Sequence, residues 1–227
     1  MQFDINNNLL AQSSATLLRR KNLYWIIGGA GSGKTTISQA LLAKLGVPVY
    51  DMDDHIYGTY HSRFTQERHP VNTAWSKSQD GLAWLLDMTW DDFNNFNQAA
   101  IPEYLNLLCE DIDAMSPDTR LLVDGGICNP TILAQAFPTN QIVCLATPGR
   151  SSTEIWRETD ERKSMKEIIF QLPNPKEAWR KFLEFDEKIT HTILKECQES
   201  NIAVFSRSAT ETVVELTERV ANALGLC

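Results

Sequence analysis

An eight-residue glycine-rich segment constrains this chain more than any other part of its sequence. The segment fits the pattern G-x-x-x-x-G-K-[ST] at every fixed position, and it consists of Gly28, Gly29, Ala30, Gly31, Ser32, Gly33, Lys34 and Thr35. The apolar run 23–27 precedes it, and residues 36–45 follow with the apolar spacing of a helix. A buried strand, a tight loop and a helix are the context that this pattern requires. We therefore predict a phosphate-binding loop in preference to an ordinary glycine turn.

The residue types of this loop each have a chemical reason. Glycines let successive backbone N–H groups point to one centre, and the N-terminus of the following helix adds its positive dipole. Lys34 is predicted to bind the β- and γ-phosphates of a nucleoside triphosphate, and the Thr35 hydroxyl to ligate the Mg²⁺ that bridges them. The pattern thus predicts ATP and Mg²⁺ as ligands, with Gly28 to Thr36 around the phosphates. The choice between ATP and GTP as the donor stays open.

Composition narrows the class of protein. The chain has 227 residues, a net charge of −8 and a pI near 5.0, which argue against DNA or RNA as a partner because phosphate backbones bind clustered Lys and Arg. Its five cysteines are odd in number and lack C-x-x-C spacing, so neither a disulfide framework nor a zinc site is expected. No apolar run suits a signal peptide or a membrane span. We predict a single cytoplasmic domain, residues 1–227, that binds a nucleoside triphosphate and a small molecule.

Four further short apolar runs lie at residues 47–50, 121–123, 142–145 and 202–205. Each is bounded by polar or turn residues, and segments with helical spacing separate them. Buried strands that alternate with helices are typical of a parallel sheet covered on both faces. The pattern predicts an α/β fold, a five-stranded doubly wound parallel sheet whose ligands bind at the carboxyl ends of the strands. Residues 1–21 are predicted to be a short helix or a loose arm on the outside.

The interval 56–119 is too long for a plain crossover between two strands. It contains three of the six tryptophans, Trp75, Trp84 and Trp90. We predict a helical insertion that covers the substrate. The alternative is that these aromatic side chains only form a small core of the insertion itself.

Local signals inside the insertion predict where helices begin. Residues 81–86 have helical spacing. Thr89 and Asp92 have the spacing of a helix cap, and Pro102 is predicted to open a further helix at its first position.

A second long interval, 148–176, is predicted to form a lid over the phosphates. Cations are needed there because the transferred phosphoryl group carries charge that backbone amides alone do not neutralise. The interval supplies Arg150, Arg157, Arg162 and Lys163. Acidic residues alternate with these cations, so a solvated charged helix is the alternative. The segment 177–197 has apolar residues at three- and four-residue steps and is predicted to be a long core helix.

Two aspartates follow the second apolar run at its end. In an extended segment the side chains of Asp51 and Asp53 point to the same side. We expect Asp51 near the metal ion and Asp53 further out, where it holds or deprotonates a substrate hydroxyl. An acidic turn or a helix cap is the alternative.

Asp124, Gly125 and Gly126 close the third apolar run. An acidic residue at the end of a buried strand suits metal binding, so the predicted metal site consists of Thr35, Asp51 and Asp124. Many ATP-hydrolysing motors carry a glutamate directly after such an aspartate to activate water. Here two glycines follow, which leaves open backbone for a bound substrate and favours transfer over hydrolysis. A simple turn is the alternative explanation of the glycines.

Together these features resemble the shikimate kinase and nucleoside monophosphate kinase group of small P-loop kinases, over most of the chain from residue 23 to residue 224. The resemblance implies that Asp51 lies by the metal ion and that Asp53 contacts the acceptor. It also implies that Gly125 and Gly126 line the acceptor pocket.

The same resemblance assigns the cationic residues. It implies that Arg157 and Arg162 are the lid arginines and that the loop after the last strand, residues 206–209 with Arg207, borders the adenine. An acceptor carboxylate or phosphate needs an arginine clamp. Arg63 and Arg68 are the only arginines of the insertion, and Arg63 is therefore predicted to bind the acceptor.

These observations predict an ATP- and Mg²⁺-dependent kinase that moves the γ-phosphoryl group to a hydroxyl of a small molecule, with Lys34, Asp53 and Arg157 as catalytic residues. One alternative is a nucleoside or nucleotide kinase, in which tryptophans stack on the acceptor base. Another is a regulatory module that binds the nucleotide, hydrolyses it slowly or not at all, and docks a protein on its insertion. The sequence leaves the acceptor and the oligomeric state open.

Overall fold

The computed structural model describes residues 2–208 and 210–226. Its centre is a five-stranded parallel sheet in the order β2-β3-β1-β4-β5. The strands are β1 (Leu23–Ile27), β2 (Val49–Asp51), β3 (Leu121–Asp124), β4 (Ile142–Ala146) and β5 (Ala203–Ser206). Each strand begins and ends within two residues of the apolar run that predicted it. The predicted fold class is confirmed.

The strand register brings distant segments to one edge of the sheet. Ile26 of β1 lies beside Asp124 of β3, and Asp124 lies beside Asp51 of β2. Because the strands are parallel, their carboxyl ends share this edge. The glycine-rich loop, which leaves β1, therefore starts next to two carboxylates.

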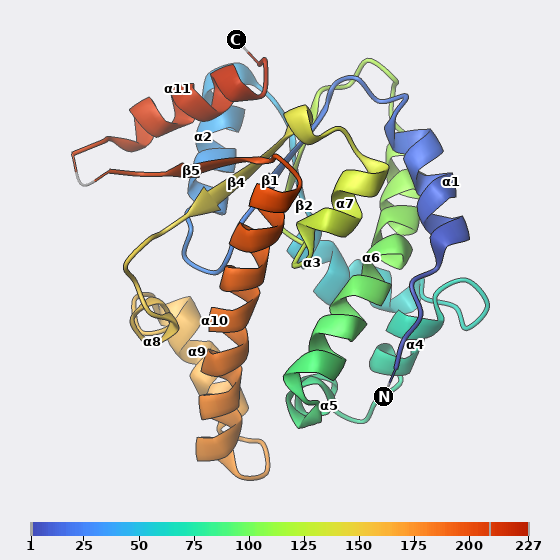
Figure 1. Cartoon of the computed structure of the whole chain (residues 1–227), viewed down its shortest axis with the longest axis vertical. Helices are drawn as coiled ribbons and strands as arrows, with labels where there is room; N and C mark the ends of the chain where they lie inside the picture. Colours follow the sequence, from blue (N-terminus) through green and yellow to red (C-terminus); the bar gives the residue numbers. More distant parts are fainter. Residues whose placement is uncertain (1, 209, 227) are drawn as a thin grey trace.

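Helices cover both faces of the sheet (Figure 1). One face carries α2 (Lys34–Leu45) and α11 (Val213–Ala223), which pack against each other. The other face carries the helices α1 (Asn7–Leu17), α6 (Trp90–Asp113), α7 (Pro130–Ala136) and α10 (Pro175–Glu199). A short 3-10 helix, η2 (Thr139–Gln141), leads into β4.

The central strand β1 supplies side chains to both cores. Trp25 and Ile27 lie in the core under α6 and α10, whereas Tyr24 and Ile26 lie in the core under α2 and α11. Successive side chains of a strand point to opposite faces, so a strand that is covered twice is apolar throughout. This is why the run before the loop shows no alternation of polar and apolar residues.

The N-terminal segment forms a packed helix. The Asn6 side chain accepts a hydrogen bond from the backbone N–H of Leu9 at 3.0 Å and so caps α1. Helix α1 packs on α6 and α7, and Leu17 is fully buried. Of the two expectations for residues 1–21, the short helix is the one observed.

The interval 56–119 is helical. After α3 (Met52–Tyr57) it contains the elements η1 (Thr59–Ser62), α4 (Pro70–Ser76), α5 (Gly81–Asp87) and α6. Thr89 caps α6 as predicted, because the Asp92 backbone N–H donates to the Thr89 hydroxyl at 3.1 Å.

The expectation for Pro102 is wrong, because Pro102 lies inside α6 and does not open a new helix. A proline inside a helix removes one backbone hydrogen bond and strains the preceding turn. The helix continues because its next turns bury Leu105 and Leu108 completely in the core. Tertiary packing outweighs the local helix-breaking signal here.

The tryptophans of the insertion pack mainly against other aromatic rings. The Trp84 ring lies 5.4 Å from Phe96, and the Trp90 ring lies 5.6 Å from Phe185 of α10, both measured between centroids. Aromatic rings at such distances and in edge-on orientation stabilise a core. For these two tryptophans the structure supports the alternative, a packing role.

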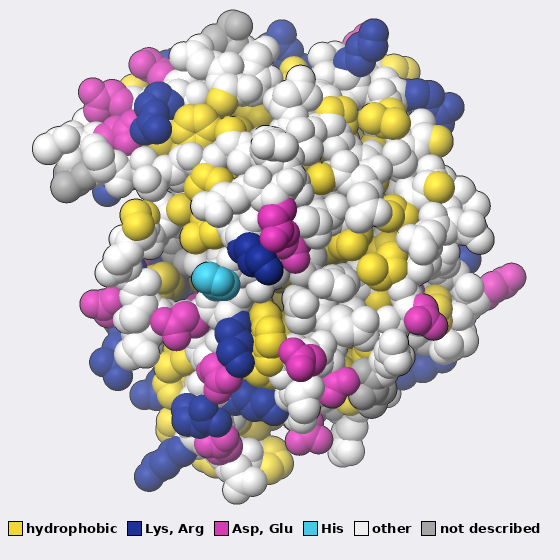
Figure 2. Space-filling model, in the orientation of Figure 1, with side chains coloured by type: hydrophobic (Ala, Val, Ile, Leu, Met, Phe, Trp, Pro, Cys, Tyr) yellow, Lys and Arg dark blue, Asp and Glu magenta, His cyan; other side chains and the backbone are white. Residues whose placement is uncertain are grey.

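The interval 148–176 forms two short helices, α8 (Ser152–Ile155) and α9 (Asp160–Ile169), before α10 begins. Figure 2 shows Lys and Arg side chains interleaved with Asp and Glu over the lower part of the view, where α8, α9 and α10 lie. Several of these charges form ion pairs within one helix, such as Lys163 with Asp160 at 2.8 Å. Within the described residues no helix combines the length and the apolar character needed to cross a bilayer.

Candidate active site

The glycine-rich loop connects β1 to α2 and packs directly against the lid segment. A Cβ atom on Gly31 would lie 2.8 Å from Cγ2 of Ile155 in α8, which is closer than carbon atoms approach. The Thr147 hydroxyl, which follows β4, donates to the Gly31 carbonyl at 3.0 Å. The loop is therefore held between the segment after β4 and α8.

Lys34 begins α2, and its side chain folds back over the loop. Its ammonium donates hydrogen bonds to the carbonyl oxygens of Gly28 at 2.8 Å and Gly29 at 3.2 Å. This places a cation at the concave side of the loop, beside the N-terminus of a helix. Both features favour the binding of an anion.

A cavity of about 330 Å³ opens beside the loop. Its lining consists of Ala30, Gly31, Gly33, Lys34, Thr35, Thr36, Trp156, Arg162 and Met165. The first six come from the loop and α2, and the last three come from the lid segment 148–176. The structure thus places six of the predicted phosphate-binding residues and one predicted lid arginine around one space, whereas Gly28, Gly29 and Ser32 are not part of this lining.

The two lid arginines have different positions. Arg162 donates to the Glu158 carboxylate at 2.8 Å and to the Ile155 carbonyl at 3.3 Å, and it lines the cavity. Arg157 is exposed between α8 and α9 and is not part of that lining. Arg207 is also exposed, just beyond the end of β5. Arg162 is therefore the arginine that the structure brings to the loop. Ala209 of the expected adenine border lies outside the described residues.

Asp124 at the end of β3 is buried and has a free acceptor position. Its side chain is 4% exposed, and Oδ1 has no hydrogen-bond partner among residues 2–208 and 210–226. Burial raises the pKa of Asp124 to about 6, the nearby charge of Lys34 lowers it, and the carboxylates of Asp51 and Asp53 raise it. A buried carboxylate in this state needs a cation to compensate its charge.

These residues fit a Mg²⁺ ion that is shared with a triphosphate. Thr35 and Asp124 supply hard oxygen ligands, and Asp51 lies beside Asp124 in the strand register. The described residues contain no group of three or more His, Cys, Asp or Glu side chains that forms a metal site by itself. Mg²⁺ usually binds through one or two protein oxygens, substrate phosphates and water, so the fit requires the nucleotide.

The local structure around Asp51 and Asp53 differs from the extended segment that we expected. Strand β2 ends at Asp51, and Asp51 caps α3 by accepting from the Asp54 backbone N–H at 3.0 Å. Asp53 lies in the first turn of that helix. The expected alternation of a strand is therefore wrong here, and the helix-cap alternative is correct for Asp51.

Asp53 reaches the site through a contact distant in the sequence. Its Oδ1 accepts a hydrogen bond from the Gly126 backbone N–H at 3.0 Å. Burial raises the pKa of Asp53, while Lys34 and the Gly126 N–H lower it. The side chain is nevertheless accessible to solvent. The charges of Asp53 and Lys34 therefore act on each other at the carboxyl edge of the sheet.

The glycine pair after β3 has a packing role that the sequence did not indicate. Gly125 and Gly126 both have a φ of +77°, a region that other residues rarely adopt. A Cβ on Gly125 would lie 2.4 Å from Oδ2 of Asp53, and one on Gly126 would lie 2.2 Å from Cγ of Met52. The pair lets α3 approach β3 and holds Asp53 in place.

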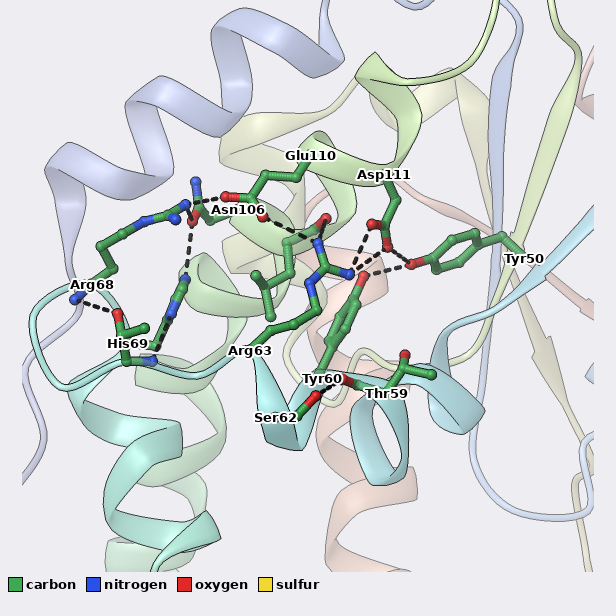
Figure 3. Close-up of polar contacts among 12 residues, drawn as sticks. Tyr50, Thr59, Tyr60, Ser62, Arg63, Arg68, His69, Asn106, Glu110 and Asp111 are labelled. Carbon is green, nitrogen blue, oxygen red and sulfur yellow. Dashed lines mark hydrogen bonds and ion pairs between the residues drawn. The ribbon is translucent and has the colours of Figure 1, made fainter.

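Arg63 does not reach this site. Its guanidinium pairs with Asp111 at 2.8 Å and with Glu110 at 3.1 Å on α6, and it lies over the Tyr60 ring. Arg68 binds the Glu110 carboxylate as well. Figure 3 shows both arginines pointing to the carboxylates of α6. These ion pairs hold η1 and the start of α4 against α6, so Arg63 stabilises the packing of the insertion.

Three residues that the sequence analysis did not assign to the site lie near Asp53. The charge of Asp53 acts on the pKa values of Tyr57, Tyr104 and Cys128, and burial raises all three. These residues come from α3, α6 and the segment after β3. No local pattern marks them, because only the tertiary fold brings these elements together.

The strand order, the loop and the helices on both faces define a P-loop fold. No protein-family model matches the sequence, and no curated protein matches it. Solved structures with a similar arrangement include a Thermus thermophilus protein designated TT1252, with a TM-score of 0.46 and 18% sequence identity over 90% of this chain and 96% of the other. They also include shikimate kinase from Acinetobacter baumannii in complex with shikimate, with a TM-score of 0.40 and 15% identity over 90% of this chain and 94% of the other.

Proposed function

We propose that this chain is a kinase that transfers the γ-phosphoryl group of Mg²⁺-bound ATP to a hydroxyl of a small molecule. The position of Asp53 is the observation that supports it most. The Gly126 N–H holds the carboxylate at 3.0 Å, and the Lys34 ammonium lies near enough to lower its pKa against the effect of burial. A carboxylate with a raised pKa, placed opposite a phosphate-binding lysine, suits a general base for an attacking hydroxyl.

The donor half of the site consists of the loop and its neighbours. On nucleotide binding, the Lys34 ammonium exchanges the carbonyl oxygens of Gly28 and Gly29 for phosphate oxygens. Thr35 and Asp124 would hold the Mg²⁺ ion, which when bound neutralises charge on the β- and γ-phosphates. Arg162 adds a cation from the lid side of the same cavity.

The chemical step is an in-line displacement. Asp53 orients the acceptor hydroxyl and accepts its proton while the hydroxyl oxygen attacks the γ-phosphorus. The new P–O bond forms as the bond to the β-phosphate oxygen breaks, and ADP leaves. Positioning of the two reactants supplies much of the rate gain in such a site. In this proposal residues 56–119 cover the acceptor and residues 148–176 close over the phosphates.

The test is acceptor-dependent release of ADP at saturating Mg²⁺ and ATP, measured with a panel of small alcohols. We expect no release by Lys34→Ala and full nucleotide binding by Asp53→Asn. ATP turnover at the same rate with and without each acceptor favours the regulatory module instead. Nucleotide binding without any ATP turnover favours it as well. The cytoplasmic location stays a prediction from composition.

One observation favours a nucleoside or nucleotide as the acceptor. The Tyr57 and Trp75 rings lie 5.8 Å apart and nearly perpendicular, and Tyr57 is exposed beside Asp53. An open aromatic ring offers a surface for a nucleobase. Thermal stabilisation by nucleosides in the presence of Mg²⁺ and ATP, exceeding that by sugars, supports this second candidate.

A further inference from the structure

We infer that Glu158 is a positioning residue for nucleotide binding, because it holds the guanidinium of Arg162 beside the phosphate-binding loop. The inference rests on the proposed function, since it concerns how the donor half of the same site binds its triphosphate. In the sequence, the acidic residues of segment 148–176 are the reason for considering a solvated charged helix instead of a lid. In the structure, one of these acids is the contact that places the lid arginine.

The guanidinium of Arg162 lies at the glycine-rich loop itself. A Cβ atom on Gly31 would lie 3.5 Å from Nη1 of Arg162, which is ordinary van der Waals contact. Both residues line the cavity of about 330 Å³ beside the loop, and the Arg162 side chain is 25% exposed. A guanidinium in contact with a phosphate-binding loop is within reach of the oxygens of a bound triphosphate.

The segment that precedes α9 holds one end of this guanidinium. Its Nη1 donates to Oε2 of Glu158 at 2.8 Å and to the Ile155 carbonyl at 3.3 Å. Among the side chains and backbone groups that the structure describes, Nε and Nη2 of Arg162 have no hydrogen-bond partner. Arginine presents its N–H donors in a planar fork. The free donors can therefore bind phosphate oxygens while Nη1 stays on Glu158.

The helix α8, which carries the Ile155 carbonyl, is fixed on two sides. The Ile155 side chain packs on the loop, where a Cβ on Gly31 would lie 2.8 Å from its Cγ2. The next residue, Trp156, packs edge-on against Phe182 of α10, with 4.7 Å between the ring centroids. Glu158 follows this anchored helix by three residues. The acceptors of Arg162 thus have a defined position relative to the loop.

A second arginine holds Glu158 from the other side. Arg150, four residues after the end of β4, donates from Nη1 to Oε1 of Glu158 at 3.3 Å, and its Nη2 lies 3.3 Å from Oε2. The carboxylate thus connects the start of the lid segment with α9. Two guanidinium groups and one carboxylate leave one net positive charge. Glu158 therefore fixes Arg162 without cancelling the positive charge that a triphosphate requires.

The contact between Glu158 and Arg162 is too exposed to contribute much to folding. The Glu158 side chain is 47% exposed, and ion pairs at such positions add little to stability. The contact acts on the order of the arginine side chain instead. A guanidinium that is already in place loses less side-chain freedom when it binds a phosphate. Loss of Glu158 should therefore weaken nucleotide binding and leave the unfolding of the protein unchanged.

The experiment is a double-mutant cycle on the full chain, with the dissociation constant of Mg²⁺-bound ATP as the readout. We expect Arg162→Ala to weaken binding by roughly tenfold or more and Glu158→Ala by roughly 3- to 30-fold. In the Arg162→Ala background, Glu158→Ala should cause no further loss, because no guanidinium remains to be positioned. An effect of Glu158→Ala that persists without Arg162 indicates a merely structural role and overturns the inference.

Asp160→Ala is the matched control on the same lid segment. Asp160 pairs with Lys163 at 2.8 Å, and neither residue lines the cavity beside the loop, so this variant should bind Mg²⁺-bound ATP as wild type does. Equal affinities of Glu158→Ala and Asp160→Ala overturn the inference. Tighter binding by Glu158→Ala overturns it too, because Glu158 would then compete with the phosphates for Arg162.

The affinity of the wild type separates failure of this inference from failure of the proposed function. A wild type that does not bind Mg²⁺-bound ATP contradicts the proposed function and the inference with it. A wild type that binds the nucleotide, with Glu158→Ala equal to the control, contradicts only the positioning role of Glu158 and leaves the kinase proposal intact.

Discussion

The phosphate-binding loop takes its shape from eight consecutive residues, whereas the surroundings of Asp53 are assembled from segments far apart in the sequence. The loop, Lys34 and Thr35 follow one another between β1 and α2. The surroundings of Asp53 combine α3 with the glycines after β3. A site built on backbone and local sequence keeps its form when distant parts change. A site built on tertiary contacts depends on each of them.

Lys34→Ala should produce the largest effect, because it removes the cation of the donor half. We expect phosphoryl transfer to fall on the order of 10³-fold or more, together with weaker nucleotide binding. Lys44→Ala is the matched control on the same helix, since Lys44 only pairs with Glu218 at the surface. Turnover by Lys34→Ala comparable to that of the control contradicts the role of the loop.

Asp53→Asn should remove the proposed base and leave nucleotide binding by the loop intact. We expect kcat to fall on the order of 10²- to 10³-fold because the base is lost. The exposed neighbour Asp54 provides the control Asp54→Asn. Since burial raises the pKa of Asp53 and the base acts when ionised, wild-type activity should rise with pH through that pKa. A pH profile without this limb refutes the assignment of Asp53 as base.

Gly125→Ala should displace the side chain of Asp53. Its Cβ would lie 2.4 Å from Oδ2 of Asp53, at a φ of +77°. Gly46→Ala shares the conformational strain, with a φ of +65°, but meets no atom within 4 Å. Both variants should lose about 1–2 kcal/mol of stability in denaturant unfolding, and only Gly125→Ala should also lose transfer activity. Equal activities of the two variants speak against the positioning of Asp53 by this glycine.

A buried carboxylate inside the insertion gives a pH-dependent prediction. Glu103 of α6 accepts from the backbone N–H groups of Val71 at 3.0 Å and Asn72 at 2.8 Å. Burial raises its pKa from 4.5 to about 7, so the folded protein binds more protons between these values and loses stability as the pH rises through them. The loss is at most about 3 kcal/mol.

Glu103→Gln removes this titration. Its unfolding free energy, measured in urea at pH 5 and pH 8, should therefore improve relative to wild type as the pH rises. A constant difference between the two proteins at both pH values contradicts the raised pKa.

Arg63→Ala should have the smallest effect. Its ion pairs with Glu110 and Asp111 are partly exposed, and such pairs contribute about 1 kcal/mol or less. We expect a small loss in unfolding free energy and unchanged turnover. A large rise in KM for the acceptor restores the original assignment of Arg63 to the acceptor.

The sequence predicts the donor half well because its signals are local. Buried strands appear as continuous apolar runs, and the loop pattern fixes Lys34 and Thr35 by spacing alone. The cap at Thr89 is local too. Pro102 shows the limit of such signals, since the buried contacts of α6 decide whether a helix continues through it.

The acceptor half was predictable only in part. Asp53 was identified, but its hydrogen bond to Gly126 spans 73 positions of the sequence, and the helix that begins after Asp51 was not expected. Arg63 was assigned to the acceptor because it is a cation in the right interval, and only the structure shows its partners on α6. Tyr57, Tyr104 and Cys128 carry no such pattern, because only the tertiary fold brings α3, α6 and the segment after β3 together.

The most direct test of the two-half site is a binding titration of Mg²⁺-bound ATP with wild type, Lys34→Ala and Asp53→Asn. The account predicts that Asp53→Asn binds the nucleotide as wild type does, that Lys34→Ala loses roughly tenfold or more in affinity, and that acceptor-dependent ADP release falls by roughly a hundredfold or more in both variants. Equal affinities of wild type and Lys34→Ala, or a loss of binding in Asp53→Asn, would contradict the separation of donor and acceptor halves.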